Sequence, residues 1–177
     1  MKQSVTNIIL IGPMGAGKSA IGREIARQST LDFFDSDEQI IKHSGVDISW
    51  IFEKEGEAGF RKREHQVLKA LCKKSHCIIA TGGGCIMQAE NRALLVDNGF
   101  VVELKISLDE QLKRLEKNLY KRPLYHNQPQ PDTLIQLNQM REPLYASIAD
   151  FSVDTGTIHR KIVAQTILNA FDQYRQK

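Results

Sequence analysis

The fold is decided by the stretch Gly12-Pro13-Met14-Gly15-Ala16-Gly17-Lys18-Ser19. It follows the apolar run Ile8–Ile11 and precedes a segment of helical composition, Ala20–Gln28. This order of strand, loop and helix is the context that a phosphate-binding P-loop requires. The glycines let backbone N–H groups approach phosphate oxygens, and the following helix directs the positive end of its dipole at the same charge. The stretch therefore predicts a site for a nucleoside triphosphate.

Two side chains of this loop have expected roles of their own. Lys18 supplies a point charge for the β- and γ-phosphates, and Ser19 places a hydroxyl where Mg²⁺ sits beside a bound nucleotide. The alternative is a glycine turn that only joins a strand to a helix. The combination of Gly12, Gly17, Lys18 and Ser19 rarely arises by accident in a chain of this length, so the P-loop is favoured.

Composition indicates one ordinary globular domain, because the 177 residues are 41 % apolar and 25 % charged. The net charge of +3 is modest and the basic residues are dispersed, so we expect no nucleic-acid partner. No apolar run approaches the roughly 20 residues that span a bilayer, and the first residues lack a signal peptide. Cys72, Cys77 and Cys85 form no CxxC pair, which argues against zinc and disulfides. We expect a cytoplasmic protein.

Five short runs of β-type residues alternate with segments of helical length. This alternation predicts an α/β fold in which a five-stranded parallel sheet is flanked by helices on both faces. In such sheets ligands bind at the carboxyl ends of the strands. The expected strands are Val5–Ile11, Leu31–Phe34, Cys77–Ala80, Phe100–Leu104 and Phe151–Val153.

The segments between the strands carry start and stop signals for helices. Asp47 is expected to cap one helix, and a second is expected between Gly56 and about Lys73. The helical pattern breaks between about Asn118 and Pro131, where an irregular insert is typical of a lid. Two more helices are expected, over Asp132–Ala149 with an interruption near Pro143, and over Thr157–Tyr174 with a cap at Thr157.

A carboxylate pair, Asp35 and Asp37, follows the second expected strand. If the chain is still extended there, residues two apart project to the same side and face the nucleotide. Paired carboxylates can divide the work, because one holds Mg²⁺ through water while the other accepts the proton of an attacking hydroxyl. The alternative is an Asx turn with a cap for the helix that begins at Glu38. The residues alone leave both possibilities open.

Three consecutive glycines, Gly82-Gly83-Gly84, follow the third expected strand. They permit close approach of the backbone to a ligand and offer free N–H groups. The alternative is that they ease a strand into a helix. Because three glycines are costly in conformational entropy for a simple turn, the ligand-binding interpretation is favoured.

Three arginines are candidates for anion binding, although each taken alone is typical of a solvated surface residue. Arg61 lies in the helix after Gly56, and Arg141 lies in the helix after the insert. Arg122 stands before Pro123 in the insert, where a mobile cation could reach a transferring phosphate when a lid closes.

Taken together, these motifs resemble those of the shikimate kinases in order and approximate spacing. The resemblance covers nearly the whole chain, from about Asn7 to the final helix. Its most specific parts are the Asp-Ser-Asp and the triple glycine, because other small P-loop kinases share the first motif without these two. The motifs are Gly-Pro-Met-Gly-Ala-Gly-Lys-Ser at 12–19, Phe34-Asp35-Ser36-Asp37, Gly59-Phe60-Arg61, Thr81-Gly82-Gly83-Gly84, Lys121-Arg122-Pro123-Leu124 and Arg141-Glu142-Pro143-Leu144-Tyr145.

The resemblance implies a three-layer P-loop NTPase fold like that of the nucleoside-monophosphate kinases. One kinase domain over residues 1–177 would contain a substrate-binding region at about 35–63 and a lid at about 117–131. The implied reaction is ATP-dependent phosphorylation of the shikimate 3-hydroxyl, giving shikimate 3-phosphate and ADP in the route to chorismate and aromatic amino acids. The implied cofactors are ATP and Mg²⁺, the implied partner is the small molecule shikimate, and a monomer is expected.

The family's site residues carry over by position. Asp37 resembles the residue that binds the shikimate hydroxyls and serves as the base. Arg61 and Arg141 resemble the pair that grips the substrate carboxylate, a task suited to a guanidinium fork, and Gly83 is implied to add a backbone contact. Arg114 falls where the family often stacks a guanidinium on adenine. The implied ATP site is Gly15, Ala16, Gly17, Lys18, Ser19, Ala20, Arg114 and Arg122, with Lys18 and Arg122 also catalytic, and the implied Mg²⁺ site is Ser19 and, through water, Asp35.

Two other functions are compatible with the P-loop alone. A different small-molecule kinase, acting on gluconate or a nucleoside monophosphate, would share Lys18 and Ser19. It does not predict the Asp35/Asp37 pair, Arg61 and the triple glycine together. A regulatory module would bind ATP without phosphorylating a metabolite. It predicts slow hydrolysis that shikimate does not change.

Overall fold

The centre of the structure is a parallel sheet whose middle strand is the apolar run before the P-loop. The computed structural model describes residues 5–121 and 131–176. Strand β1 (Ile8–Ile11) is fully buried, as expected for a strand covered on both faces. The strand order is β2-β3-β1-β4-β5 and every pair is parallel, which confirms the predicted sheet. The other strands are β2 (Asp32–Asp35), β3 (Cys77–Ala80), β4 (Phe100–Lys105) and β5 (Phe151–Asp154).

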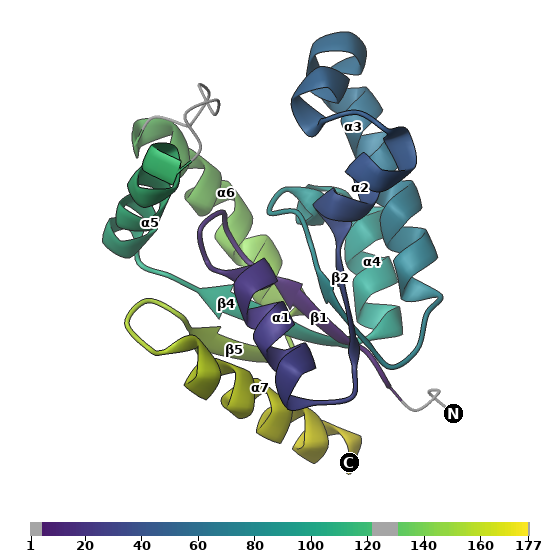
Figure 1. Ribbon diagram of the computed structural model, residues 1–177, viewed down its shortest axis with the longest axis vertical. Helices are drawn as coiled ribbons and strands as arrows, with labels where there is room; N and C mark the ends of the chain where they lie inside the picture. The colour runs from purple at the N-terminus through teal and green to yellow at the C-terminus, as the bar shows by residue number, and fades with distance from the viewer. Residues whose placement is uncertain (1–4, 122–130, 177) are drawn as a thin grey trace.

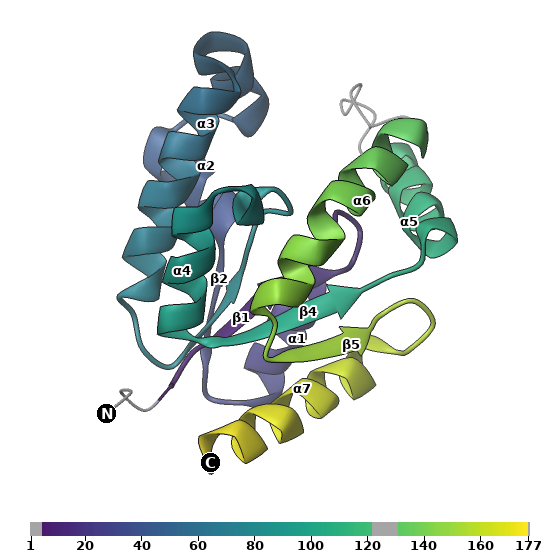
Figure 2. The same cartoon turned by 180° about the vertical axis from the view of Figure 1, so that it is seen from behind.

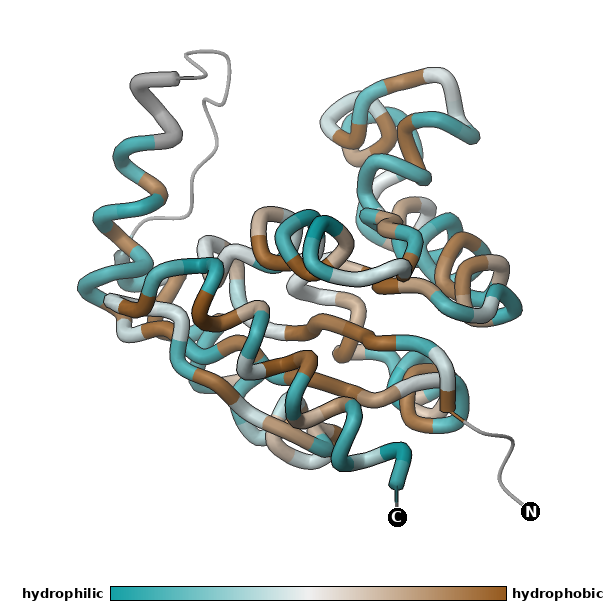
Figure 3. Tube along the Cα trace, turned by 60° about the horizontal axis from the view of Figure 1, so that its bottom comes forward, coloured by the Kyte–Doolittle hydropathy of each residue, from teal (hydrophilic) through white to brown (hydrophobic). Residues whose placement is uncertain are grey.

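Helices cover both faces of the sheet and form two hydrophobic cores. Helices α1 (Lys18–Gln28) and α7 (Arg160–Arg175) pack together on the face toward which Ile8 and Leu10 point (Figure 1). The opposite face receives Ile9 and Ile11 and is covered by α3 (Ile48–Cys72), α4 (Ala89–Asn98) and α6 (Pro131–Ile148) (Figure 2). Alternate residues of one strand thus anchor both cores. Figure 3 shows the resulting apolar layer along the strands.

Two groups of helices rise beyond the carboxyl ends of the strands. Helix α2 (Ser36–Ser44) and the first part of α3 stand on one side, and α5 (Leu108–Lys121) with the start of α6 stands on the other (Figure 1). Gly56, with a φ of 69° and a ψ of −175°, breaks α3 into two helical segments, as the sequence predicted. Among the described residues, no helix combines the length and apolar character needed to cross a bilayer.

The first strand begins later than predicted because Asn7 clamps neighbouring loops together. This side chain is 3 % exposed, and its Nδ2 donates to Lys74 O at 2.7 Å and to Asn98 O at 3.3 Å. Its Oδ1 accepts from the N–H of Cys77 at 3.2 Å. The clamp holds the starts of β1 and β3 in register at the end of the sheet opposite the P-loop.

Two predicted helix boundaries were wrong. The last helix is capped by His159, whose ring nitrogen accepts from the N–H two residues on at 3.3 Å, so the predicted cap at Thr157 lies outside the helix. The loop before it is tied down by Thr155, whose hydroxyl donates to Ala16 O at 2.8 Å. Helix α5 continues to Lys121, beyond the predicted break at Asn118.

The predicted interruption of the sixth helix was also wrong, because α6 runs through Pro143. Proline removes a single N–H, and the carbonyl that loses its partner belongs to Gln139, which is exposed and can bind water. Leu134 and Tyr145, both buried, hold the two halves of α6 against the protein.

Candidate active site

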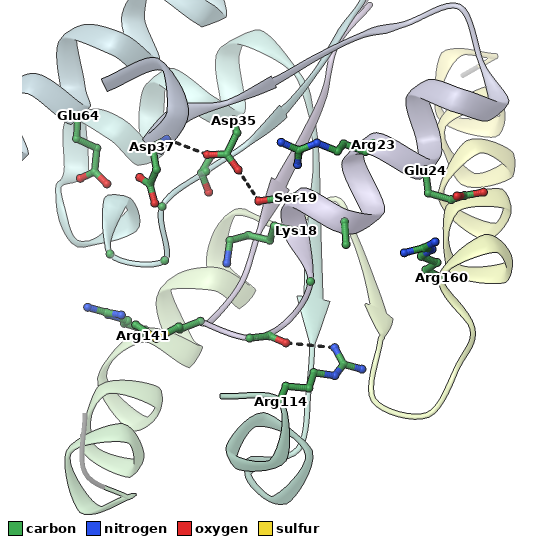
Figure 4. Close-up of a pocket in the computed structure, with 18 of the residues that line it drawn as sticks. Lys18, Ser19, Arg23, Glu24, Asp35, Asp37, Glu64, Arg114, Arg141 and Arg160 are labelled. Carbon is green, nitrogen blue, oxygen red and sulfur yellow. Dashed lines mark hydrogen bonds between the residues drawn. The ribbon is translucent and has the colours of Figure 1, made fainter. Parts of the chain in front are cut away.

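A cleft of about 1140 Å³ lies over the carboxyl ends of the central strands. Its walls come from the P-loop, the junction of β2 and α2, helix α3, the loop after β3, and helices α5 and α6 (Figure 4). Ala16 is buried behind this wall, and Arg122 lies outside the described residues. The predicted site residues that line the cleft are Gly15, Gly17, Lys18, Ser19, Ala20, Asp35, Asp37, Arg61, Gly83, Arg114 and Arg141.

The P-loop places the N-terminus of α1 at the cleft. Gly17 is the N-cap with a φ of 91°, and no side chain caps the helix. The first N–H groups of α1 are therefore available to an anion. At the start of the loop, Gly12 has a φ of 142°, and a Cβ there would stand 2.5 Å from Leu104 O. No larger residue fits this position without moving the backbone of β4.

Lys18 lies along its own loop. Its Nζ donates to Gly12 O at 2.7 Å and to Pro13 O at 2.9 Å. Desolvation lowers the pKa of Lys18 to about 8, although the nearby carboxylates of Asp37 and Asp35 oppose the shift. Because the ammonium of Lys18 is desolvated and has only carbonyl partners, a bound phosphate would strongly stabilise its charged form.

Asp35 caps a helix and also lines the cleft, so the capping interpretation is confirmed and the functional one stays a prediction. Its Oδ1 accepts from Asp37 N at 2.9 Å and from Glu38 N at 3.3 Å, which caps α2. Its Oδ2 accepts a hydrogen bond from the hydroxyl of Ser19.

The oxygen donors of Ser19 and Asp35 fit Mg²⁺. This hard cation prefers oxygen ligands and takes one or two protein groups together with water and phosphate oxygens. The described residues contain no group of three or more His, Cys, Asp or Glu side chains placed to hold a metal by itself. The pair therefore suits a metal that arrives with a nucleotide.

Asp37 reaches the cleft from a helix and not from an extended chain. Strand β2 ends at Asp35 and α2 begins at Ser36, so the expected alternation of an extended strand was wrong. Burial, and then the charge of Asp35, raise the pKa of Asp37 to about 6, against the opposing effects of Lys18 and Arg61. Asp37 is therefore a carboxylate that accepts a proton close to neutral pH.

Glu64 is a site residue that sequence reasoning missed. It is fully buried one turn after Arg61 on α3, and its Oε2 accepts from Arg61 Nη1 at 2.7 Å. Desolvation raises the pKa of Glu64, while Arg61 opposes the shift. The pair holds the guanidinium against the triple glycine, since a Cβ on Gly84 would stand 2.4 Å from Arg61 Nη2. The three-residue spacing of Arg61 and Glu64 was the available signal.

Two more side chains without a predicted role position the triple glycine. The buried hydroxyl of Ser36 accepts from Gly82 N at 3.0 Å, and the hydroxyl of Tyr145 donates to Gly83 O. Ser36 lies between Asp35 and Asp37, and Tyr145 ends the motif that begins at Arg141, so both belong to motifs in which only other residues had a predicted role. A Cβ added to Gly83 would be in van der Waals contact with Met14 N at 3.5 Å, so this loop lies close to the P-loop.

Arg114 lies beside the P-loop, and its stacking on adenine stays a prediction. Its Nη1 donates to Gly15 O at 3.2 Å, and its Nη2 donates to Gly156 O at 2.8 Å and to Thr155 O. Arg114 also borders a second recess of about 340 Å³, whose other walls include Ile158 and the start of α7. This recess adjoins the cleft, since Gly17, Ala20 and Arg114 line both.

Three buried side-chain atoms of the described residues have no hydrogen-bond partner, and all three belong to residues of the cleft. They are Asp37 Oδ1, Glu64 Oε1 and Arg141 Nε. Leaving such groups unpaired is costly, so their concentration in one place indicates a polar ligand. Two carboxylates and a guanidinium suit a molecule that carries both hydroxyl groups and an anionic group.

Comparison with known proteins places the chain among named relatives. The family model described as shikimate kinase matches residues 14–172. The chain is 45 % identical over 169 residues to the shikimate kinase of Coxiella burnetii (strain Dugway 5J108-111), covering 95 % of this chain and 94 % of that protein. It is 47 % identical over 164 residues to the shikimate kinase of Legionella pneumophila (strain Corby), covering 93 % of each. The solved shikimate kinase from Acinetobacter baumannii in complex with shikimate superposes with a TM-score of 0.89 and 40 % identity, covering 98 % of this chain and 96 % of that one.

The raised pKa of Asp37 predicts that this carboxylate destabilises the folded protein at neutral pH. Its pKa is about 6 when folded against an ordinary value of 3.8, so the folded state binds more protons between these values and the free energy of unfolding falls as pH rises. We expect Asp37→Asn to raise the free energy of unfolding at pH 7.5 by at most about 3 kcal/mol. The gain should shrink as pH falls toward 4.

Urea unfolding at pH 7.5 and 4.5 measures this effect. Asp47→Asn is the matched control, because Asp47 is exposed and its side chain makes no capping hydrogen bond, so its effect should stay within about 0.5 kcal/mol. An Asp37→Asn protein less stable than the parent at pH 7.5, or equally stabilised at both pH values, would contradict the prediction.

Proposed function

The chain belongs to the shikimate kinase family and catalyses the ATP-dependent phosphorylation of shikimate, and we propose that the cleft aligns the 3-hydroxyl of shikimate with the terminal phosphate of ATP. The products are shikimate 3-phosphate and ADP, in the route to chorismate and aromatic amino acids. The observation that carries this assignment is the set of unpaired groups on Asp37, Glu64 and Arg141. Shikimate offers hydroxyl groups to the carboxylates and a carboxylate to the guanidinium.

Arg61 and Arg141 bind the substrate carboxylate in this proposal. They approach the cleft from α3 and α6, on opposite sides of the triple glycine. Glu64 holds the Arg61 guanidinium in place, so little side-chain entropy is lost when the carboxylate binds. Gly83 adds a backbone contact, and the bond from Tyr145 to its carbonyl fixes the orientation of that peptide.

Asp37 acts as the base. It orients the 3-hydroxyl and takes its proton as the oxygen attacks the γ-phosphorus, while the bond from that phosphorus to the departing ADP oxygen breaks on the opposite side. A pKa of about 6 suits this task, because the group is ionised at pH 7 and still accepts a proton readily. Lys18 stabilises the negative charge that spreads over the transferring group.

The nucleotide lies over the P-loop with its base toward Arg114. Backbone N–H groups of Gly15 and Gly17–Ala20 and the ammonium of Lys18 hold the phosphates, whereas the N–H of Ala16 already donates to Pro13 O at 3.2 Å. Arg122 completes the set of cations in this proposal. Ser19 and, through water, Asp35 would hold Mg²⁺, which would supply positive charge beside the phosphates. The recess beside Arg114 receives the adenine ring.

Residues 1–177 form one kinase domain in this proposal, and the chain works as a monomer. The substrate-binding region is about 35–63, comprising α2 and the first part of α3, and the lid is about 117–131.

A coupled assay of ADP release tests the function. We expect release to depend strictly on shikimate, with a rate in its absence at least about 100-fold lower, because the acceptor supplies the attacking hydroxyl. Gluconate and a nucleoside monophosphate serve as alternative acceptors in the same assay. Release that is equally fast without shikimate, or that requires one of the other acceptors, would overturn the assignment.

The base role of Asp37 predicts a separation of binding from turnover. Asp37→Asn keeps the shape of the side chain but cannot accept the proton, so we expect kcat to fall at least about 100-fold while the affinity for ATP stays within about twofold. Steady-state kinetics and calorimetric titration of the nucleotide measure the two quantities. A variant with near-normal turnover would remove Asp37 from the base role.

If Arg61 and Arg141 bind the substrate carboxylate, their loss should change KM for shikimate more than it changes KM for ATP. Removing a charge-assisted contact weakens binding, so we expect Arg61→Ala and Arg141→Ala each to raise KM for shikimate by about tenfold or more, with a small change in KM for ATP. Arg63→Ala is the matched control, because Arg63 lies on the same helix, pairs with Glu55 and does not line the cleft. Equal effects of Arg61→Ala and Arg63→Ala on KM for shikimate would contradict the specific role.

A further inference from the structure

Gln111 is a buried polar side chain outside the lining of the cleft, yet it is hydrogen-bonded to two parts of the site. It is 0 % exposed, and its Nε2 donates to Met14 O of the P-loop at 2.7 Å. Its Oε1 accepts from Asn138 Nδ2 on α6 at 2.8 Å. A buried carboxamide is costly unless it is paired, and here both ends are paired with elements far away in the sequence. Gln111 therefore joins α5 to the P-loop and to α6.

The chemistry of the partners sets the orientation of this carboxamide. Met14 contributes a carbonyl, which can only accept, so the NH₂ group of Gln111 must face it. The carbonyl oxygen of Gln111 is then left for the amide of Asn138. If the carboxamide of Gln111 were flipped, its oxygen would face Met14 O and its NH₂ group would face the NH₂ group of Asn138, so neither hydrogen bond could form.

The contact with Met14 O controls an N–H group of the P-loop. In a planar trans peptide the C=O and the following N–H point in opposite directions. Gln111 draws Met14 O toward α5, so the N–H of Gly15 is turned away from α5. Arg114, one turn later on α5, binds the next carbonyl, Gly15 O, at 3.2 Å. A Cβ on Gly15 would stand 3.4 Å from Gln111 Cγ, so helix and loop are in direct contact.

The contact with Asn138 reaches the helix that carries Arg141. Asn138, Arg141 and Tyr145 are spaced by three and four residues and so share one face of α6. Asn138 is tied to the P-loop through Gln111, and Tyr145 donates to Gly83 O. Arg141 lies between these two anchors.

We propose that Gln111 is a positioning residue for phosphoryl transfer: it orients the Met14–Gly15 peptide of the P-loop and, through Asn138, holds that loop at a set distance from Arg141. The proposal rests on the proposed function, because it takes Arg141 as part of the acceptor site. Its consequence is that Gln111 affects nucleotide binding and turnover without touching either substrate.

A purely structural role for Gln111 makes a different prediction. If the side chain only satisfies buried groups, its loss lowers stability and leaves the kinetic parameters of the folded protein unchanged. If it positions the loop, nucleotide affinity and kcat change while the affinity for shikimate alone does not. The comparison of kcat with the separate dissociation constants of ADP and shikimate therefore distinguishes the two roles.

Gln111→Met and Asn138→Ala break the chain of hydrogen bonds at different points. Methionine is close to glutamine in size but cannot bind Met14 O, so we expect Kd for ADP to rise about tenfold and kcat to fall about tenfold or more, with Kd for shikimate within about twofold. Asn138→Ala keeps the bond to Met14 O, so we expect kcat to fall about fivefold with Kd for ADP within about twofold. Gln139→Ala, an exposed neighbour on α6, is the matched control and should leave all three within about twofold.

The double variant tests whether the two residues act as one chain. Because Gln111→Met already breaks the link, adding Asn138→Ala should leave kcat unchanged, whereas independent residues would multiply their effects. Multiplied reductions would overturn the link. Values of kcat and Kd for ADP within about twofold of the parent in Gln111→Met would overturn the positioning role.

The stability of the variants is measured in parallel by thermal unfolding. If Gln111→Met does not fold, the test rests on Asn138→Ala, because Asn138 is only partly buried. An unchanged kcat in Asn138→Ala then overturns the proposal. Measurements on the parent enzyme distinguish a failure of this proposal from a failure of the proposed function. ADP release by the parent that does not depend on shikimate would refute the acceptor assignment. Kd for ADP in Gln111→Met would still test whether Gln111 orients the P-loop.

Discussion

The site depends on the close approach of two backbone loops. A Cβ added to Gly83 would be in van der Waals contact with both Gly12 O and Met14 N, at 3.5 Å, so only about the space of a methyl group separates the triple glycine from the P-loop. This approach is possible because β1 and β3 are neighbours in the sheet. Thr81 strengthens the junction, since both its N–H and its hydroxyl donate to Leu10 O, at 3.1 and 3.0 Å. The spacing of these two loops is therefore set by the backbone, which is stiffer than any pair of long side chains.

Within this frame, desolvation acts in opposite directions on the two central ionisable groups. It lowers the pKa of Lys18 to about 8 and raises that of Asp37 to about 6, so both charged forms are held less firmly than in water. Their mutual attraction offsets only part of this cost. Both groups are charged near pH 7, so their burial lowers the folding stability there. Burial also raises the pKa of Glu64, and its carboxylate accepts the hydrogen bond that holds Arg61.

The parts of the site that lie at strand ends could be predicted from sequence, because a parallel sheet gathers its carboxyl ends at one edge. The P-loop, Asp35 and the triple glycine follow directly from that rule. Asp37 was placed correctly for a wrong reason, since its helix begins one residue after β2 and not after an extended segment. Helix caps were harder to predict, because His159 replaced Thr157 once tertiary contacts had fixed the preceding loop. Arg122, which the sequence assigns to the lid, is outside the described residues.

What sequence reasoning could not find are the side chains that join distant segments. Ser36 and Gly82 are 46 residues apart, and Gln111 and Met14 are 97 apart, so no local pattern marks either pair. Their importance follows from hydrogen-bond geometry, which tolerates shifts of only a few tenths of an ångström. Helix α5 binds two successive P-loop carbonyls through Gln111 and Arg114, one turn apart. A displacement of α5 must therefore either carry the loop with it or break both bonds, which makes the helix and the anion-binding loop one mechanical unit.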